Sequence, residues 1–367
     1  MHSHSRIAFH EKYEKLNQIG EGTYGIVYKG RNKENGDIVA IKIFRNTDED
    51  YVAHKIAIRE IRMLKQLHHP NLVNLIEAFK KKKRLHLVFQ FVDQNLYTEL
   101  LQHPNGLDRQ FIKRITYQIL DGINFCHNRN CIHRDIKPEN ILISKEEQVK
   151  LCDFGFARII NPGGSYTDYV ATRWYRSPEL LVGDTQYGPP VDIWAIGCVF
   201  VEIMTGRELW GGRSDVDQLY EIMKSLGPLL PRHREIFEKN AFFEGITIPQ
   251  VTNYEGLEVK FVDIDPSVTN KEMTFLKACL QMDPSKRSSA ESLLKFEYFD
   301  SLKNIDCNEE EIICKKKLHK DRKVRSRSNG TLSVFPMLPS SQTFTHQPII
   351  NNFKQMKFKN FTYFPQL

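Results

Sequence analysis

The first part of the chain alternates apolar and polar residues around glycine-containing turns. Residues 13–45 contain three such stretches, and two more follow at Leu72–Phe79 and Leu85–Val92. A period of two is typical of strands that bury one face, so these stretches predict a β-meander and two further strands. Residues 53–67 instead place apolar side chains at helical spacing, at Ile56, Ile61, Leu64 and Leu67. We therefore expect a sheet accompanied by one helix.

The second part of the chain, from residue 96 onward, has mostly helical periodicity. Residues 109–127 and 191–205 predict two long helices, and Pro189-Pro190 stand directly before the second. Residues 271–300 predict terminal helices, and the chain contains no internal repeat. The predicted fold class is therefore α+β, with strands and one helix first and helices afterwards.

The composition is that of a soluble globular protein, with 41% hydrophobic and 26% charged residues. No apolar run approaches the ~20 residues that span a bilayer, and the polar segment Met1–His10 lacks the apolar stretch of a secretory signal. The seven cysteines form no CxxC pair, which favours reduced thiols and argues against a structural zinc site. We expect the protein in the cytoplasm, the nucleus or both.

The basic charge is concentrated at the C-terminal end. The whole chain has 52 Lys and Arg against 45 Asp and Glu, and residues 301–367 hold 12 against 5, so the remainder is balanced. We expect residues 300–367 to be a flexible basic tail and residues 1–12 an N-terminal extension. The run from Lys315 to Arg327 has three interpretations: a nuclear-import signal, a contact with RNA or phospholipid, or a solvated tail. Nucleic-acid binding is not expected outside this tail.

A second basic run, Lys80–Arg84, lies between two predicted strands. The simpler interpretation is a solvated hairpin turn. The alternative is a docking patch for a partner.

A glycine-rich loop, with glycines at positions 20, 22 and 25, lies between two predicted strands. Glycines allow backbone N–H groups to approach phosphates closely, because no Cβ intervenes. A dinucleotide-binding loop would open a helix instead. The nucleotide-binding candidates in this loop are Ile19, Gly20, Glu21, Gly22, Thr23, Tyr24, Gly25, Ile26 and Val27.

Lys42 lies in the apolar stretch Val39-Ala40-Ile41-Lys42 of a predicted strand. A buried ammonium needs an anionic partner, and Glu60 on the following helix is the candidate. Together they would hold the ammonium against nucleotide phosphates.

The sequence His133-Arg134-Asp135-Ile136-Lys137-Pro138-Glu139-Asn140 gathers three kinds of reactive group in one segment. Asp135 can accept a proton from a hydroxyl, Lys137 can neutralise a moving phosphoryl group, and Asn140 can bind a metal ion. Asp153, in the later triplet Asp153-Phe154-Gly155, offers a second metal ligand, and Gly155 offers conformational freedom.

In these motifs the chain resembles the protein kinase family over about residues 12–300. The resemblance implies a bilobal domain at residues 13–299, with a β-rich N-lobe (13–92) and a mainly helical C-lobe (96–299). It implies ATP and Mg²⁺ as cofactors and protein substrates. It also implies a buried Glu179–Arg287 ion pair, an Asp192 that anchors the segment around Asp135, and a structural Trp194. Further implied positions are an apolar stack of Leu64, Leu75, His133 and Phe154, a bulky Phe89 at the ATP pocket, and a hinge at Gln90, Phe91 and Val92.

The resemblance also implies regulation by phosphorylation of Thr167 and Tyr169, through an upstream kinase or autophosphorylation. Arg forks suit phosphate oxygens, so arginines that converge near this segment are the expected receivers. Arg59, Arg134 and Arg158 would receive phosphorylated Thr167, and Arg173 and Arg176 phosphorylated Tyr169.

Within kinases the chain is similar to the cyclin-dependent-kinase-like family. The similarity rests on His54–Glu60, the triplet Thr167-Asp168-Tyr169, Glu179–Gly188 and Ser214–Tyr220. The Pro-Ser-Thr prefix of a cyclin-binding helix is missing, which argues against cyclin dependence. The family implies Ser/Thr targets followed by Pro or a small residue, with a basic residue upstream, and a link to cilia. Thr23 and Tyr24 match inhibitory sites of cyclin-dependent kinases.

A second hypothesis is a pseudokinase or scaffold with the same fold. Such a protein would be expected to have lost Lys42, Asp135 or Asp153, and all three are present. We therefore favour an active enzyme.

Overall fold

The computed structural model describes most of the first 302 residues of the 367-residue chain. The described ranges are 12–22, 25–45, 51–159, 173–264 and 266–302. The chain divides at residue 309, and every described residue belongs to the first part. Within the described ranges, no helix is both long and apolar enough to span a membrane.

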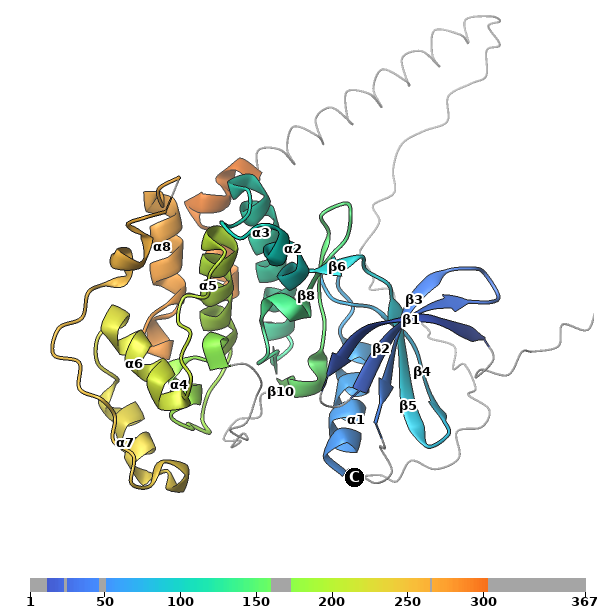
Figure 1. Ribbon diagram of the computed structural model, residues 1–367, viewed down its shortest axis with the longest axis horizontal. Helices are drawn as coiled ribbons and strands as arrows, with labels where there is room; N and C mark the ends of the chain where they lie inside the picture. Colours follow the sequence, from blue (N-terminus) through green and yellow to red (C-terminus); the bar gives the residue numbers. More distant parts are fainter. Residues whose placement is uncertain (1–11, 23–24, 46–50, 160–172, 265, 303–367) are drawn as a thin grey trace, which may run out of the picture. The chain divides into compact units, whose positions relative to one another are not determined.

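The N-terminal region is a five-stranded antiparallel sheet with one helix against it (Figure 1). The helix α1 spans Tyr51–Gln66, close to the predicted range. The strands are β1 (Tyr13–Gly22), β2 (Gly25–Asn32), β3 (Ile38–Phe44), β4 (Leu75–Lys81) and β5 (Arg84–Gln90), in the order β1-β2-β3-β5-β4.

The fourth strand begins three residues later than the sequence predicts. The prediction started it at Leu72, but the backbone before Leu75 pairs elsewhere. The Val73 amide donates to the Leu151 carbonyl at 2.9 Å, and the Leu151 amide donates to Asn71 at 2.9 Å. Apolar periodicity is the same for either pairing, so the sequence could not separate them.

The two faces of the sheet have different surroundings. Val27 on β2 is paired with Lys42 on β3, and Lys42 with Leu87 on β5, so their side chains share one face. This face meets α1, because Lys42 contacts Glu60 of that helix. The opposite face carries a separate apolar cluster of Val39, Ile41, Ile43 and Val88, packed by Tyr13, Tyr28 and Phe79.

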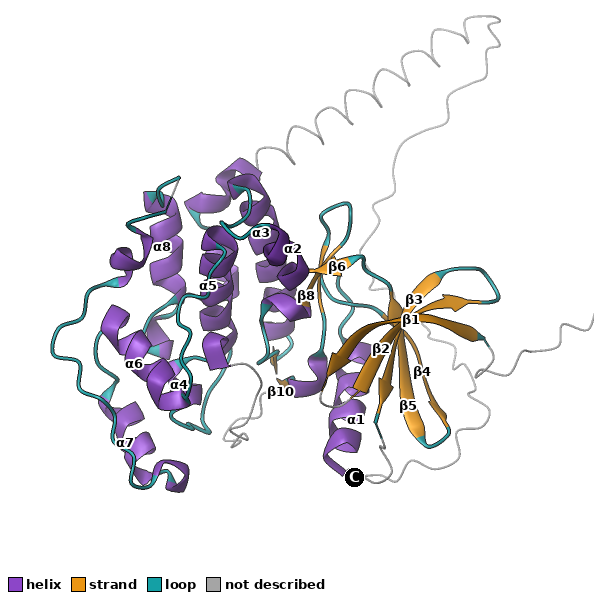
Figure 2. Cartoon of the chain, viewed as in Figure 1, coloured by secondary structure: helices purple, strands orange, loops and turns teal. Residues whose placement is uncertain are grey.

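The C-terminal region is mainly helical (Figure 2). Its helices are α2 (Leu96–Gln102), α3 (Arg109–His127), α4 (Pro178–Leu181), α5 (Pro190–Thr205), α6 (Asp215–Leu226), α7 (Pro231–Lys239), α8 (Asn270–Cys279) and α9 (Ala290–Leu294). Short strands, which the sequence analysis missed, are β6 (Gln94–Asn95), β7 (Cys131–Ile132), β8 (Ile141–Ile143), β9 (Val149–Leu151) and β10 (Arg158–Ile159). They pair as β6-β8-β9 and β10-β7.

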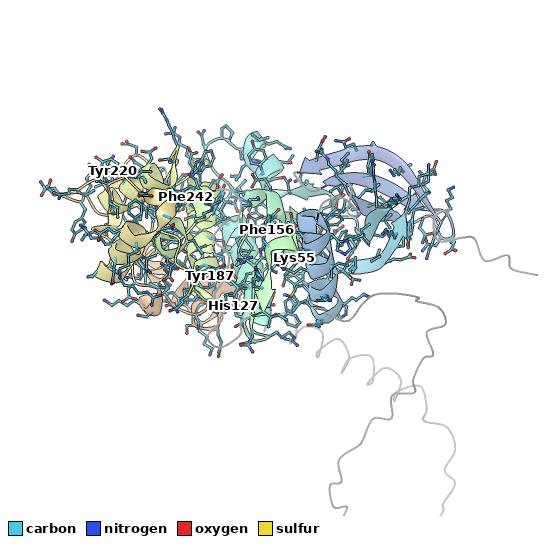
Figure 3. All side chains as sticks on the ribbon, turned by 90° about the horizontal axis from the view of Figure 1, so that it is seen from below. Lys55, His127, Phe156, Tyr187, Tyr220 and Phe242 are labelled. Carbon is cyan, nitrogen blue, oxygen red and sulfur yellow. The ribbon has the colours of Figure 1, made fainter. Side chains whose placement is uncertain are left out.

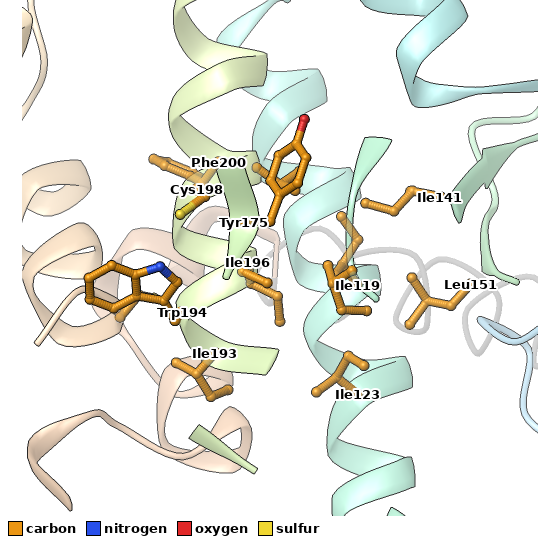
Figure 4. Close-up of a cluster of buried hydrophobic side chains, with 14 of the residues drawn as sticks. Ile119, Ile123, Ile141, Leu151, Tyr175, Ile193, Trp194, Ile196, Cys198 and Phe200 are labelled. Carbon is orange, nitrogen blue, oxygen red and sulfur yellow. The ribbon is translucent and has the colours of Figure 1, made fainter. Parts of the chain in front are cut away.

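The two long helices that the sequence predicts are confirmed as α3 and α5, and they pack together in the core of this region. The Asp108 carboxylate caps α3 by accepting from the amides of Gln110 and Phe111. Helix α5 begins at Pro190, where proline is tolerated, and ends at Gly206 with φ 73°, a conformation that favours glycine. Figure 4 shows the contact between the helices, with Ile119 and Ile123 from α3 and Ile193, Ile196 and Phe200 from α5.

The predicted Glu179–Arg287 ion pair is confirmed. The guanidinium donates to both carboxylate oxygens at 2.5 and 2.8 Å, and the side chains are 2% and 0% exposed. Trp194 is fully buried, as predicted, and the guanidinium lies 4.9 Å from its ring centroid. The pair ties α4 to the helical core.

Candidate active site

The segment around Asp135 lies between β7 and β8 and is held by Asp192 of helix α5. The Asp192 carboxylate accepts from the backbone amides of His133 and Arg134 at 2.9 and 2.8 Å, and from His127 Nε2 at 2.9 Å. Burial opposes its ionisation, but these bonds outweigh burial and keep the pKa of Asp192 below its ordinary value. The predicted anchoring role of Asp192 is therefore confirmed.

Two residues of the site hold left-handed backbone conformations that non-glycine residues rarely adopt. Arg134 has φ 68° and Asp153 has φ 60°. Each such residue costs about 1–3 kcal/mol and persists only where its surroundings fix it. Arg134 is fixed by donating to the Phe156 carbonyl at 2.7 Å and to the Tyr187 hydroxyl. Phe156 and Tyr187 both lie at the middle of Figure 3.

Asp135, Lys137 and Asn140 come together as predicted. Lys137 Nζ lies 3.1 Å from Asp135 Oδ2. The Asn140 amide donates to Asp135 Oδ2 at 2.7 Å and to the Asp135 carbonyl at 2.8 Å. Burial outweighs the nearby ammonium and raises the pKa of Asp135 above its ordinary value. A fixed carboxylate with a raised pKa suits the acceptance of a proton.

The Lys42 ammonium lies between two carboxylates. It is 3.0 and 2.8 Å from the Glu60 oxygens and 3.0 Å from Asp153 Oδ1. The predicted pairing with Glu60 is confirmed, and the contact with Asp153 is an addition to it. Burial disfavours the ammonium, but the two carboxylates outweigh burial and raise the pKa of Lys42.

The pKa values of the two carboxylates that contact Lys42 in this triad shift in opposite directions. Burial raises the pKa of Glu60 to about 7, against the pull of Lys42. For Asp153, Lys42 outweighs burial and lowers the pKa, so this carboxylate is ionised at neutral pH.

In the glycine-rich loop, the space that a Cβ would occupy is open at two of the three glycines. A Cβ on Gly22 would meet nothing within 4 Å, and one on Gly20 would make only ordinary contacts with Val27 at 3.8 and 3.9 Å. A Cβ on Gly25, in contrast, would lie 2.6 Å from the Ile43 carbonyl oxygen, so strand packing requires this glycine. The open room at Gly20 and Gly22 fits the approach of phosphate oxygens. Thr23 and Tyr24 lie outside the described residues.

One predicted nucleotide-binding side chain is on the wrong face. Ile26 is paired with Ile43 and lines a cavity on the face opposite Lys42. The prediction took the loop as a continuous run, although alternate strand residues point to opposite faces. Val27 and the buried Phe89 share the face of Lys42. Ala40, which is paired with Phe89, joins them and was missed, although the period of two could have found it.

The remaining described residues of the predicted nucleotide site are more exposed than Phe89. Ile19 is 44% exposed, and Glu21 contacts Arg45. In the hinge, Phe91 and Val92 are half-buried, and Lys29 Nζ lies 4.6 Å from the Phe91 ring centroid.

Asn140 and Asp153 fit the binding of a divalent cation. Both hydrogens of the Asn140 amide go to Asp135, so Oδ1 is its atom for a metal, and Asp153 supplies an ionised carboxylate. Among the described residues, no group of three or more His, Cys, Asp or Glu side chains could hold a metal alone. Two ligands suit Mg²⁺, which takes its remaining ligands from water and substrate phosphates.

Arg59, Arg134 and Arg158 come together, as predicted, from α1, the Asp135 segment and β10. Burial, followed by the charges of the other two arginines, lowers the pKa of Arg59 to about 10. Such a cluster of cations suits a doubly charged anion. Thr167 and Tyr169 lie outside the described residues, so their predicted contacts remain predictions.

Arg173 and Arg176 lie elsewhere and share a carboxylate that the sequence analysis missed. Arg173 Nε is 3.1 Å and Arg176 Nη1 is 3.5 Å from Asp215 Oδ1 of helix α6. Asp215 lies in the segment Ser214–Tyr220 that carries the family similarity, but nothing in that segment indicated an ion pair with these arginines. Their predicted part in binding phosphorylated Tyr169 stays a prediction.

The predicted apolar stack is partly visible in the contacts. His133 and Phe154 meet edge to face with ring centroids 4.8 Å apart, Leu64 is buried, and Leu75 is half-buried. Gly155 adds a packing constraint, because a Cβ there would lie 2.8 Å from Ile56 Cγ2 of α1. The described conformation therefore has α1 packed closely on the Asp153 segment.

The fold and this constellation define a protein kinase. The protein kinase domain family matches residues 13–299 of the chain. The predicted bilobal α+β fold, with a β-rich N-lobe and a mainly helical C-lobe, is confirmed.

Several relatives are similar over most of their length. Cyclin-dependent kinase-like 4 from Mus musculus is 51% identical over 357 residues, which cover 97% of this chain and 100% of that protein. Cyclin-dependent kinase-like 4 from Homo sapiens is 55% identical over 328 residues, covering 89% and 84%. Cyclin-dependent kinase-like 1 from Caenorhabditis elegans is 55% identical over 284 residues, covering 77% and 79%. The chain belongs to the cyclin-dependent-kinase-like family of protein Ser/Thr kinases.

The triad predicts a pH-dependent loss of stability in Lys42→Met. In the parent protein the lowered pKa of Asp153 contributes stability that is present above its unfolded pKa of about 4 and is lost as pH falls. Without the ammonium, the pKa of Asp153 rises, so the variant lacks this stability as pH increases from about 4 to 7; Glu60, whose pKa is already about 7 in the parent, adds to the deficit only above that pH. We expect a deficit of about 3–5 kcal/mol near neutral pH that shrinks at lower pH. Urea unfolding at several pH values measures it.

Lys42→Arg is the matched control, because it keeps the positive charge. Its stability should follow the pH dependence of the parent protein. An equal deficit for Lys42→Met at all pH values would contradict the electrostatic account of the triad.

Proposed function

We propose that this kinase transfers the γ-phosphate of Mg·ATP to Ser and Thr hydroxyls with Asp135 as the proton acceptor. The observation that carries the proposal is the fixed position of the Asp135 carboxylate, which contacts both Lys137 and Asn140. These two neighbours from the same segment set the geometry and charge of the carboxylate. Phosphoryl transfer depends mainly on positioning and charge neutralisation, which such an arrangement supplies.

Each polar residue of the site has a proposed part. Asp135 orients the acceptor hydroxyl and takes its proton, and Lys137 stabilises the charge that develops on the transferred group. Lys42, held by Glu60, binds nucleotide phosphates. Asn140 and Asp153 would hold the magnesium ion, which when bound neutralises charge on those phosphates.

The scaffold hypothesis lacks support in the described site. A protein that uses the fold only to bind partners has no need for an ammonium between two carboxylates or for a buried Asp135 with a raised pKa. Perturbed ionisable groups of this kind are typical of active sites.

Substituting Asp135 with Asn tests the proposed chemistry. The variant keeps the shape of the side chain but cannot accept the proton, so we expect kcat to fall by about 10²–10⁴-fold. Phosphorylation of a peptide library with radiolabelled ATP measures it. Nucleotide binding and the unfolding midpoint should change little. Asp263→Asn, at an exposed position, is the control, and near-parental turnover by Asp135→Asn would refute the assignment.

The kinase is further proposed to be switched on by phosphorylation of Thr167 and Tyr169. The convergence of Arg59, Arg134 and Arg158 supports this proposal, because their mutual repulsion favours an anion. A phosphate there would join α1, which carries Glu60, to the Asp135 segment. Either an upstream kinase or autophosphorylation would supply it.

The double variant Thr167→Ala with Tyr169→Phe should lower activity by at least about tenfold, since charge-assisted hydrogen bonds contribute about 1.5–3 kcal/mol each. Mass spectrometry of the active parent protein should find phosphate at these positions. The neighbouring pair Ser165→Ala with Tyr166→Phe is the matched control. Full activity in the Thr167/Tyr169 variant would contradict the proposed switch.

The proposed substrates carry a basic residue upstream of the phosphorylated Ser or Thr and Pro or a small residue after it. A group of carboxylates supports the upstream preference. Burial, with the charges of Glu139 and Glu208, raises the pKa of Glu202 to about 7, although Tyr175 donates to Glu202 at 2.7 Å. A substrate Arg or Lys would relieve this repulsion.

Paired peptides that differ only in an upstream Arg or Ala test this preference. We expect Glu139→Gln with Glu202→Gln to reduce the ratio of their kcat/KM values by about tenfold, which corresponds to about 1.4 kcal/mol. Glu238→Gln serves as control, at an exposed position of helix α7. An unchanged ratio would place the preference elsewhere or remove it. Cyclin independence and a cytoplasmic, nuclear or ciliary location stay predictions.

A further inference from the structure

A cavity of about 510 Å³ opens on the face of the N-lobe sheet that points away from Lys42 and α1. Its lining includes Ile26, Ile41 and Ile43, which cross-strand pairing places on that face. The cavity is therefore separated from the proposed nucleotide site by the thickness of the sheet.

The floor of this outer-face cavity is aromatic. Phe79 stacks on His86 with ring centroids 5.0 Å apart and on Tyr13 at 6.3 Å. Lys15 Nζ lies 4.3 Å from the ring centroid of Tyr28. Tyr13, Tyr28, Phe79 and His86 all line the cavity, so a ligand would meet flat rings at its base. Such rings favour a bulky apolar group.

The rim of the cavity is cationic. Lys15, Arg45, Lys81, Lys82 and Arg84 line it, from β1, the end of β3 and the β4–β5 hairpin, and Arg45 is also paired with Glu21. The turn belongs to the basic run for which the sequence left a docking patch as the alternative. Lys82 lies there with φ 47°, a conformation typical of a tight turn.

Three charges of this rim, those of Lys15, Lys81 and Arg84, repel one another. Burial, followed by the charges of Lys81 and Arg84, lowers the pKa of Lys15. Burial also lowers the pKa of His86, against a bond to the Arg84 carbonyl, and Lys15, Lys81 and Arg84 lower it further. An anion at the rim would relieve this repulsion, so the site is complementary to negative charge.

We propose that the outer-face cavity is a docking site for an acidic segment of a partner protein that carries a bulky apolar side chain. Charge complementarity with the rim selects the acidic residues, and the aromatic floor accommodates the apolar side chain. A nucleic acid fits less well, because its binding depends on many phosphate contacts along a track. Here the cations surround one cavity, and residues 1–300 have no net charge.

A short fluorescein-labelled peptide of alternating Glu and Phe is the probe, and fluorescence anisotropy with the full-length chain measures its Kd. Two comparison peptides replace Glu by Lys or Phe by Gly. We expect the Glu/Phe peptide to bind at least about tenfold more tightly than either, since each lacks one half of the complementarity. Its affinity should fall as salt concentration rises.

The double variant Lys15→Gln with Arg84→Gln should weaken binding of the Glu/Phe peptide by at least about tenfold. Arg31→Gln with Lys33→Gln is the matched control, because both residues are exposed, lie in or beside β2, and give the same change in charge. The control should bind like the parent. Both variants should keep the parental unfolding midpoint and activity toward a short peptide, so the result is independent of the proposed catalytic residues.

A second measurement uses His86, which lines the cavity, as a probe of binding. In NMR titrations, the pKa of His86 should rise when the Glu/Phe peptide binds, because the carboxylates of the peptide offset part of the positive charge around the ring.

Three outcomes would overturn the proposal. Equal binding by the double variant and its control would place the peptide elsewhere. Tighter binding of a single-stranded oligonucleotide than of the Glu/Phe peptide would make the site one for nucleic acid. A large gain in peptide affinity after Glu309→Gln, Glu310→Gln and Glu311→Gln would show that the acidic stretch of the chain itself is the occupant.

Discussion

The ammonium of Lys42, enclosed by two carboxylates, is the interaction on which the rest of the site depends. It joins strand β3 to the next element of the chain, helix α1, through Glu60, and to the distant segment after β9 through Asp153. A cation in this place is favourable only while both carboxylates stay close. The triad therefore links the position of α1 to the arrangement of the residues proposed to bind magnesium and phosphate. Gly155 allows the same approach sterically, because it leaves room for Ile56 of the helix.

Much of the fold could be predicted from the sequence because the strands and long helices have clear periodicity. The pairs Lys42–Glu60 and Glu179–Arg287 could also be anticipated, the first from the need of a buried charge for a partner and the second from family resemblance. The start of β4 could not, because Leu72 and Val73 suit either of two strand pairings. Asp215 could not either, since nothing in its local sequence distinguishes it from a solvated carboxylate on a helix.

Ile26 illustrates a different limit. A motif read as a continuous run assigns every residue to one site, whereas a strand divides its side chains between two faces. Here the same strand contributes Val27 to the face of Lys42 and Ile26 to the outer-face cavity. The proposed nucleotide site and the outer-face cavity therefore lie on opposite faces of the same strands. A ligand that shifts β2 on one face would thus change the wall of the other.

The attachment of the Asp135 segment to α5 has a consequence for how such an enzyme can diversify. Asp192 is 1% exposed and lies on a helix whose side chains are almost all buried. Asp192 thereby fixes the position of the Asp135 segment relative to a buried helix. Surface loops that contact substrates or partners can accumulate substitutions without displacing the Asp135 segment. Lineages of such a protein can acquire new targets while the chemistry stays the same.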